Sequence, residues 1–250
     1  METVGEALRV DRDSPPPAGG VPTAGCLVLV DKPSGPSSFA MVSLLRRLTR
    51  IRRIGHAGTL DPFASGLMVL LVGPACRWQD TVMGADKRYR VRLRLGAESD
   101  SHDRTGVALP PPAGPLPERE RIAAALPAFR GEIEQIPPMH SAVQIGGKRL
   151  YRLARKGLEV ERPPRRVWVH GLELVDWAPP FLDLEIHCGK GMYVRSLARD
   201  LGRALGCGAL VEELRRTRVG GYAVECALDP AALRAAFATP AREDGADHAD

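Results

Sequence analysis

Residues 87–96 read KRYRVRLRLG and alternate between basic side chains and apolar or aromatic ones. Only a β-strand places successive side chains on opposite faces, so this stretch predicts a strand with one face against a core. The basic face indicates either a charged sheet edge or contacts with acidic groups of protein or RNA, and we favour the contacts. Tyr89, Val91, Leu93 and Leu95 form the apolar face, and Arg88, Arg90, Arg92 and Arg94 form the basic face.

Three other segments also have the pattern of strands. Residues 26–32 and 67–73 are short apolar runs, which are typical of strands buried on both faces. Residues 181–188 alternate apolar and polar side chains, as residues 87–96 do. Four strands of this kind supply the material for one sheet.

Two helices are expected beside these strands. Ser37 or Ser38 can cap a helix whose apolar stripe includes Phe39. Residues 192–205 form a second amphipathic pattern, which Gly206 ends. Because strands outnumber helices, we expect an α+β domain around a mixed sheet.

Composition places the chain among ordinary globular proteins. Hydrophobic residues make up 44% of the 250 residues, and the net charge of +5 is a weak indication of an anionic partner. The five cysteines are scattered and include no CxxC pair, which favours a reducing compartment. The sequence has no long apolar run and no signal-peptide pattern, so we expect a cytoplasmic protein that does not cross a membrane.

The ends of the chain differ in composition from the middle. Residues 1–24 are rich in proline, glycine and charge, and we expect them to be disordered. Residues 25–225 carry the periodic segments and are expected to form the folded domain. Residues 226–250 predict a short helix, DPAALRAAFA, followed by an acidic tail.

One loop has an unusual concentration of special residues. GHAGTLDPFASG, residues 55–66, surrounds Asp61 with glycines and places Pro62 directly after it. Proline disfavours helix at the preceding residue, and glycine allows conformations that other residues avoid. Such a loop can hold a carboxylate against a bulky ligand, although an aspartate before proline is more often only a turn residue.

The common catalytic patterns are absent from the sequence. No second carboxylate stands out, as a glycosidase would need, and no phosphate-binding GxxxxGK[ST] loop occurs. There is no HExxH or GxSxG motif, and the six histidines have no metal-ligand spacing, so we expect no metal. A lone carboxylate with many arginines and a few aromatics fits covalent or electrostatic work at a sugar carbon of RNA.

Six segments in a fixed order carry a resemblance to a known family. They are LVLVDKPSGPSS, GHAGTLDPFASGLMVLLVG, DKRYRVRLRLG, FRGEIEQIPPMHSAVQIGGKRLYRLARKG, LEIHCGKGMYVRSLARDLG and CGALVEELRRTRVGGY, which span residues 26–222. The sequence closely resembles the TruB family of tRNA pseudouridine synthases. The resemblance implies a mainly antiparallel central sheet flanked by helices. It also implies isomerisation of uridine at position 55 in the tRNA T loop, without a cofactor.

The resemblance also implies roles for seven residues. Asp61 matches the catalytic aspartate, Tyr89 a tyrosine that stacks on the target base and helps remove the C5 proton, and Arg195 an arginine that pairs with the carboxylate. Physical chemistry agrees, because a bidentate arginine keeps a carboxylate ionised. The implied substrate-binding residues are His56, Tyr193, Leu214 and Lys32.

The rest of the resemblance concerns RNA binding. Residues 137–157 match a mobile insertion that closes on the T stem-loop. The chain after Tyr222 is too short for the PUA domain that many members carry, and we expect a monomer without an obligate protein partner. Candidates for phosphate contacts are Arg46, Arg50, Arg52, Arg53, Lys148, Arg149, Arg152, Arg155, Lys156, Arg215, Arg216 and Arg218.

Two other functions are compatible with parts of this pattern. The chain could be a tRNA-folding chaperone with little or no catalysis, but a chaperone has no need of Asp61, Tyr89 and Arg195. A nucleoside glycosidase would release free uracil and would need a second carboxylate to activate water.

Overall fold

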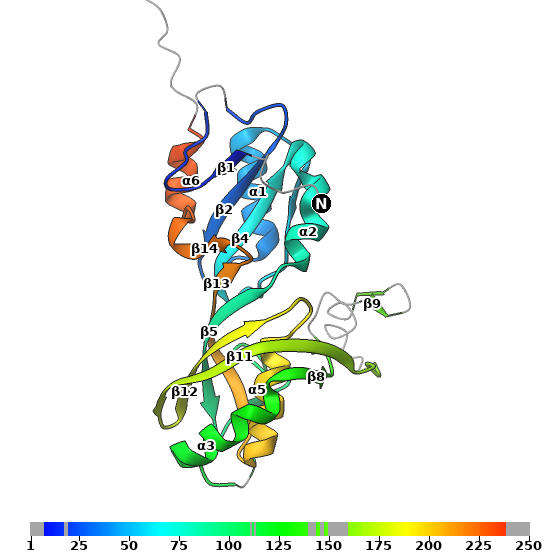
Figure 1. The fold of residues 1–250 in the computed structure, drawn as a ribbon, viewed down its shortest axis with the longest axis vertical. Helices are drawn as coiled ribbons and strands as arrows, with labels where there is room; N and C mark the ends of the chain where they lie inside the picture. Colours follow the sequence, from blue (N-terminus) through cyan, green and yellow to red (C-terminus); the bar gives the residue numbers. More distant parts are fainter. Residues whose placement is uncertain are drawn as a thin grey trace, which may run out of the picture.

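The computed structural model describes residues 8–17, 20–110, 112, 114–139 and 160–238, together with the backbone of Gln144–Ile145 and Lys148–Arg149. Ten strands form one twisted sheet, whose main path is β1-β2-β4-β13-β5-β12-β11-β8 (Figure 1). Only the β1–β2 and β13–β4 pairs are parallel, and the other pairs in this sheet are antiparallel. The α+β fold with a mainly antiparallel sheet is therefore confirmed.

The first half of the molecule has helical segments on both faces of the sheet. Helices α1 and α6 lie on one face of β2, and the segments η2 and α2 lie on the other (Figure 1). The side chains of β2 and β4 are consequently buried along almost their whole length, which explains their continuous apolar sequences. The elements are β1 (Leu8–Val10), β2 (Cys26–Lys32), α1 (Ser38–Thr49), β3 (Ile54–His56), β4 (Ser65–Val72), η2 (Gly73–Trp78), α2 (Gln79–Gly84), β14 (Tyr222–Ala223), η4 (Val224–Cys226) and α6 (Pro230–Ala236).

The second half has helices on one face of the sheet only. Helices α5 and α3 cover that face, so β5 and β12 alternate between buried and accessible residues. Strands β5 and β13 run side by side across the narrow middle of the molecule and belong to both halves (Figure 1). The elements are β5 (Lys87–Leu95), α3 (Arg119–Ala125), η3 (Leu126–Phe129), β8 (Gly131–Gln135), β11 (Arg165–Ala178), β12 (Phe181–Cys188), α5 (Val194–Leu205) and β13 (Ala209–Val219).

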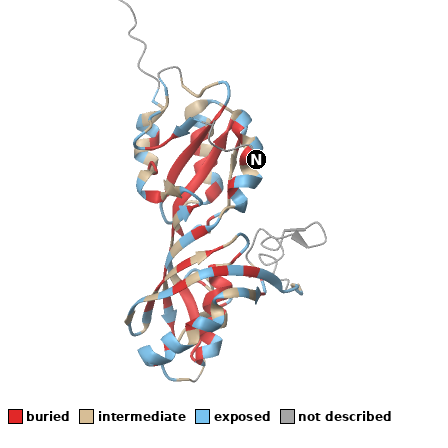
Figure 2. Cartoon of the chain, viewed as in Figure 1, coloured by how far each residue is buried: buried red, intermediate tan, exposed pale blue. Residues whose placement is uncertain are grey.

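Two short hairpins lie outside the main sheet: β6 (Glu98–Ser99) pairs with β7 (Ala108–Leu109), and β9 (Gln144–Ile145) pairs with β10 (Lys148–Arg149). The main core follows the strands through both halves, as the buried residues in Figure 2 show. No helix in the described part of the chain is long and apolar enough to cross a membrane.

The structure corrects two expectations and excludes one alternative. Leu8–Val10 forms an edge strand beside β2 and Asp11 is buried, so residues 8–11 are not disordered. Phe39 lies outside the apolar face of α1, with 63% of its surface exposed. Strand β5 is interior to the sheet rather than an edge.

The arginines on the open face of β5 have acidic neighbours within the chain. Arg92 makes two hydrogen bonds to Asp183 of β12, of 2.8 and 2.7 Å, and Arg90 lies 2.9 Å from Glu185. Cross-strand pairing of opposite charges stabilises neighbouring strands. The acidic contacts predicted for this face are therefore supplied in part by the protein itself.

Candidate active site

Asp61 lies in the loop between β3 and β4, beside a cavity of about 670 Å³. Its neighbours in this loop are tied to the first residue of α1 and to the segment before that helix. The Ser38 hydroxyl donates to the Leu60 carbonyl and accepts from the Leu60 N–H, each at 2.8 Å. The Ser34 hydroxyl donates to the Phe63 carbonyl at 2.7 Å. Hydrogen bonds on both sides of Asp61 thus hold its backbone in place.

Lys32 also holds the backbone of the Asp61 loop through hydrogen bonds. Its ammonium group donates to the carbonyls of Pro33, Pro36 and Pro62 at 2.8, 2.8 and 3.2 Å, and the residue is fully buried. Burial lowers the pKa of Lys32 to about 8, while Asp61 opposes that shift. Lys32 does not line the cavity, so its geometry suits a supporting role for the Asp61 loop rather than direct contact with a substrate.

A glycine is required where this loop enters β4. Gly66 has a φ of +106°, and a Cβ at this position would lie 2.3 Å from the backbone oxygen of Arg216 on β13. Only glycine combines that conformation with such a close approach of two strands. The last glycine of the GHAGTLDPFASG motif therefore allows β4 to pair with β13.

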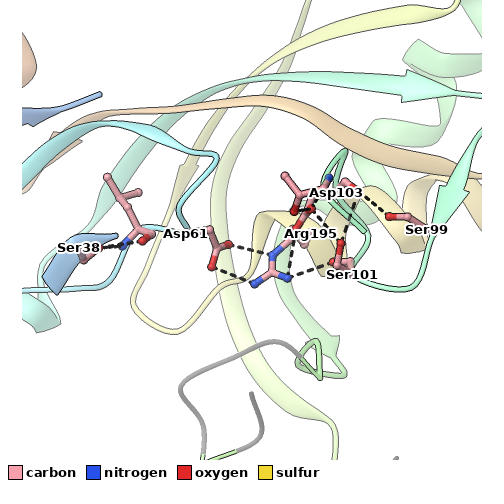
Figure 3. Close-up of polar contacts among 8 residues, drawn as sticks. Ser38, Asp61, Ser99, Ser101, Asp103 and Arg195 are labelled. Atoms are coloured by element: carbon pink, nitrogen blue, oxygen red, sulfur yellow. Dashed lines mark hydrogen bonds and ion pairs between the residues drawn. The ribbon is translucent and has the colours of Figure 1, made fainter. Parts of the chain in front are cut away.

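Arg195 holds Asp61 through a two-point contact. It lies in the first turn of α5, and its Nε and Nη2 are 2.9 and 3.1 Å from the two carboxylate oxygens (Figure 3). The Arg195 side chain is 4% exposed, whereas that of Asp61 is 32% exposed. The guanidinium therefore fixes the carboxylate from the buried side and leaves Asp61 accessible from the cavity.

Arg195 contacts a second carboxylate, which the sequence analysis did not single out. Its Nη1 lies 3.4 Å from Asp103 and donates to the Ser101 carbonyl at 3.1 Å (Figure 3). Asp103 accepts hydrogen bonds from the Ser101 hydroxyl and from the N–H and hydroxyl of Thr105, at 2.9, 2.9 and 2.6 Å. Asp103 thus orients Arg195 toward Asp61.

The charges around Asp61 act on its pKa in opposite directions. Burial raises the pKa of the Asp61 carboxyl above its ordinary value, and the nearby Asp103 adds to this. Arg195 opposes both effects through its charge and its hydrogen bond. Without Arg195, the carboxyl would be harder to ionise.

Tyr89 and Arg216 form another wall of the cavity. They are cross-strand partners on β5 and β13, and both line the cavity. Arg216 is 2% exposed and donates to the carbonyls of Leu67 and Gly58 at 2.7 and 3.1 Å. Burial raises the pKa of the Tyr89 hydroxyl, and the adjacent Arg216 counteracts this. Arg216 is therefore a buried part of the cavity wall, and its contact with phosphate stays a prediction.

Of the four predicted substrate-binding residues, two line the cavity and two do not. Tyr193 and Leu214 line it, whereas His56 and Lys32 do not. The Nδ1 atom of His56 is buried without a hydrogen-bond partner among the described residues, and burial with the nearby Arg216 lowers its pKa. Most of the insertion expected at residues 137–157 lies outside the described residues.

The cavity wall carries more basic than acidic side chains. Six are basic and two, Asp61 and Asp80, are acidic. A positive cavity of this size suits one anionic ligand unit, such as a nucleotide, better than a whole helix. The basic residues are Lys87, Arg165, Arg166, Lys190, Arg195 and Arg216.

Comparison with known families decides the relationship. Residues 46–194 match the family described as TruB family pseudouridylate synthase (N terminal domain), and residues 195–247 match the tRNA pseudouridylate synthase B C-terminal domain. The chain belongs to the TruB family.

Individual TruB proteins are similar to this chain along most of their length. The tRNA pseudouridine synthase B of Bordetella avium (strain 197N) is 44% identical over 218 residues, which are 86% of this chain and 89% of the relative. The protein of the same name from Chlamydia abortus (strain DSM 27085 / S26/3) is 44% identical over 204 residues, which are 81% and 86% of the two chains.

Solved structures show the same fold in larger proteins. A chain of a Cbf5-Nop10-Gar1 complex has a TM-score of 0.65 and 28% identity, over 86% of this chain and 56% of the other. A chain of an H/ACA RNP bound to a substrate RNA containing 2'-deoxyuridine has a TM-score of 0.61 and 25% identity, over 90% and 58%. The TruB chain thus spans a little over half the length of these two structures.

Proposed function

We propose that this protein converts uridine to pseudouridine at position 55 in the T loop of tRNA, without a cofactor. The observation that carries the proposal is the two-point contact between Arg195 and Asp61 at the wall of a basic cavity. It places an oriented carboxylate where one nucleotide can enter. Membership of the TruB family supports the reaction class, and the names of its relatives support tRNA as substrate.

In the proposed reaction, every atom of the uracil is retained. The ionised Asp61 attacks the target nucleotide and forms a bond to it, and the N-glycosidic bond breaks. The uracil turns, its C5 bonds to the sugar carbon, and the bond between Asp61 and the nucleotide breaks, which regenerates the free carboxylate. The C5 proton then leaves, and a proton is gained at the nitrogen that was released. Tyr89 lies on the cavity wall, where its ring can stack on the base and its hydroxyl can assist removal of the C5 proton.

The target nucleotide must leave its stack to reach Asp61. Extrusion of a base costs on the order of a few kcal/mol. Stacking on Tyr89 returns about 1–3 kcal/mol of that cost. Lys190, Arg165 and Arg166 are exposed and line the cavity, which suits contacts with the flanking phosphates.

The remaining parts of the proposal concern how the protein works on tRNA. Its partner is the T stem-loop. Tyr193 and Leu214 contact the uridine, and His56 helps to hold the flipped nucleotide. The protein acts as a monomer in the cytoplasm.

The test uses an unmodified tRNA transcript, with position 55 read by pseudouridine-specific chemistry and no metal or nucleotide added. Wild type should convert the site, and Asp61→Asn should bind the transcript without converting it. Asp80→Asn is the matched control, because Asp80 is the other acidic side chain of the cavity wall. It should keep most of the activity.

Two results would contradict the proposal. If wild type binds and refolds tRNA but converts nothing, the protein is a folding chaperone. If free uracil accumulates instead, the protein is a glycosidase.

A further inference from the structure

Two histidines and one aspartate meet on the open face of the sheet, away from the Asp61–Arg195 pair. Asp86 directly precedes β5, His170 lies on β11 and His187 lies on β12. The sequence spacing of the histidines indicates no metal site, but the sheet brings these two together. The spacing could not reveal this, because neighbouring strands pair residues that are distant in the sequence.

A β-bulge in β11 helps to bring His170 close to His187. Val169 pairs with Cys188 and Gly171 pairs with His187, so His170 is the extra residue between two successive pairs. Bulges of this kind redirect a side chain relative to the regular alternation. The rings of His170 and His187 lie with their centroids 4.7 Å apart and tilted by 44°.

Both imidazoles direct Nε2 toward the same carboxylate. His170 Nε2 lies 3.3 Å from Oδ1 of Asp86, and His187 Nε2 lies 3.6 Å from Oδ2. Charge-assisted hydrogen bonds are shorter, at about 2.7–2.9 Å. A tetrahedral ion with ligand bonds of about 2.0–2.2 Å keeps its ligand atoms about 3.3–3.6 Å apart. Each of the two nitrogens lies at such a separation from one oxygen of Asp86, although not from the same oxygen.

We propose that Asp86, His170 and His187 bind a divalent transition-metal ion such as Zn²⁺. All three candidate ligand atoms lie within 4.8 Å of one another, so modest side-chain rotation brings the two nitrogens to bonding distance of one ion. Two imidazoles and one carboxylate select Zn²⁺ or its transition-metal neighbours over Mg²⁺, which prefers oxygen ligands. The fourth position is open to water.

The surroundings make the site accessible. The side chains of Asp86, His170 and His187 are 49%, 33% and 34% exposed, so an ion can enter from solvent.

The site adjoins the active-site cavity. Lys87 and Gly189 line that cavity, and they follow Asp86 and His187 by one and two residues. A bound ion would link the beginning of β5 to β11 and β12. It would stabilise this wall of the cavity without contacting the nucleotide.

The experiment titrates the purified protein, freed of metal by dialysis, with Co²⁺ and Zn²⁺ at neutral pH. Co²⁺ should give visible bands typical of tetrahedral nitrogen and oxygen ligation, without the near-ultraviolet bands of thiolate ligands. Zn²⁺ should displace Co²⁺ with a stoichiometry of one and raise the Tm, whereas Mg²⁺ should do neither.

Variants locate the binding site. His170→Ala and His187→Ala should each weaken Zn²⁺ binding by at least about tenfold, because even an outer partner of a metal ligand contributes about that much. His248→Ala is the matched histidine control and should bind as wild type does. Circular dichroism and the Tm without metal verify that each variant is folded.

Three results would overturn the proposal. They are no Zn²⁺ binding by wild type, Zn²⁺ binding by the His170 and His187 variants that equals that of wild type, or thiolate bands that assign the ion to cysteine. In each case the three residues are an ordinary surface ion pair with a neighbouring histidine. None of these results bears on conversion of uridine, which is tested separately.

Discussion

Arg195 is the residue on which the geometry of the site depends. It contacts Asp61 and Asp103 together, so one positive charge is shared between two carboxylates. Asp103 is enclosed by hydrogen bonds, whereas Asp61 faces the cavity. Arg195 therefore acts on the pKa of the exposed partner and on its orientation.

Replacing Arg195 should change both the rate and its pH dependence. In Arg195→Met, burial and Asp103 raise the pKa of Asp61, and Arg195 no longer opposes them, so activity should be lost at a higher pH as the solution is acidified. The rate at neutral pH should fall by about 100-fold or more, as for other charged donors in active sites. Single-turnover rates between pH 5 and 8 measure both effects.

Arg203→Met provides the comparison for Arg195→Met, because Arg203 lies on the same helix and is exposed. It should leave the pH profile unchanged. An unshifted acidic limb in Arg195→Met would refute the electrostatic role assigned to Arg195.

Two substitutions of Tyr89 distinguish its role in stacking from its role in proton transfer. Tyr89→Phe keeps the ring and removes only the hydroxyl, so tRNA binding should stay near wild type while conversion falls sharply. Tyr89→Leu should in addition lose about 1–3 kcal/mol of binding from stacking. Equilibrium binding and conversion at position 55, measured on the same transcript, test this; full activity in Tyr89→Phe would exclude a role for the hydroxyl.

At the scale of elements, the Asp61 loop owes its shape to the segment that leads into α1. Lys32, Ser34 and Ser38 supply hydrogen bonds to the backbone of Leu60, Pro62 and Phe63, on either side of Asp61. These contacts join two loops that are about 25 residues apart in the sequence, so a local pattern does not predict them.

Removing the Ser38 hydroxyl should loosen the loop. Ser38→Ala leaves a buried N–H and carbonyl of Leu60 without their partner, which should destabilise the protein by about 1–3 kcal/mol. Conversion should fall because Asp61 is less well positioned. Ser43→Ala on the same helix is the control, and urea unfolding with conversion assays are the measurements; equal effects of the two variants would contradict a specific role for Ser38.

At the scale of the whole molecule, burial of Lys32 should make stability depend on pH. Its pKa is lowered from 10.5 to about 8 in the folded protein. Between these values the unfolded chain binds more protons than the folded one, so the free energy of unfolding contributed by Lys32 rises with pH. The full shift corresponds to roughly 3 kcal/mol.

Urea unfolding of wild type and Lys32→Met at pH 7.5, 9 and 10.5 tests this. The free energy of unfolding of wild type, relative to that of Lys32→Met, should rise with pH, because only wild type loses a buried positive charge as its lysine is deprotonated. Lys190→Met, at an exposed lysine, should show a constant gap. If the difference in free energy of unfolding between wild type and Lys32→Met does not change with pH, the pKa of Lys32 is not lowered in the folded protein.

The cavity is also a property of the whole molecule. Its wall combines the Asp61 loop of the first half, strands β5 and β13 that run through both, and the beginning of α5 in the second half. Its position at the junction explains why residues that are 134 positions apart, Asp61 and Arg195, share two contacts.

What the sequence determined by itself is the local structure with a regular period. Strands β2, β4, β5 and β12 and helices α1 and α5 were predicted because the burial of each follows one regular pattern along its length. The motif around Asp61 also identified the family, because its residues are contiguous. The pairing of Arg195 with Asp61 was implied by resemblance and is present in the structure.

Only the tertiary structure decided the elements and roles that break a local pattern. No strand was predicted for β11, whose two bulges shift its alternation, or for β13, where the buried Arg216 replaces an apolar residue. The roles of Lys32 and Asp103 were missed for a related reason. Burial of a charged group is tolerated only where distant segments supply its hydrogen bonds, and a linear pattern does not contain those partners.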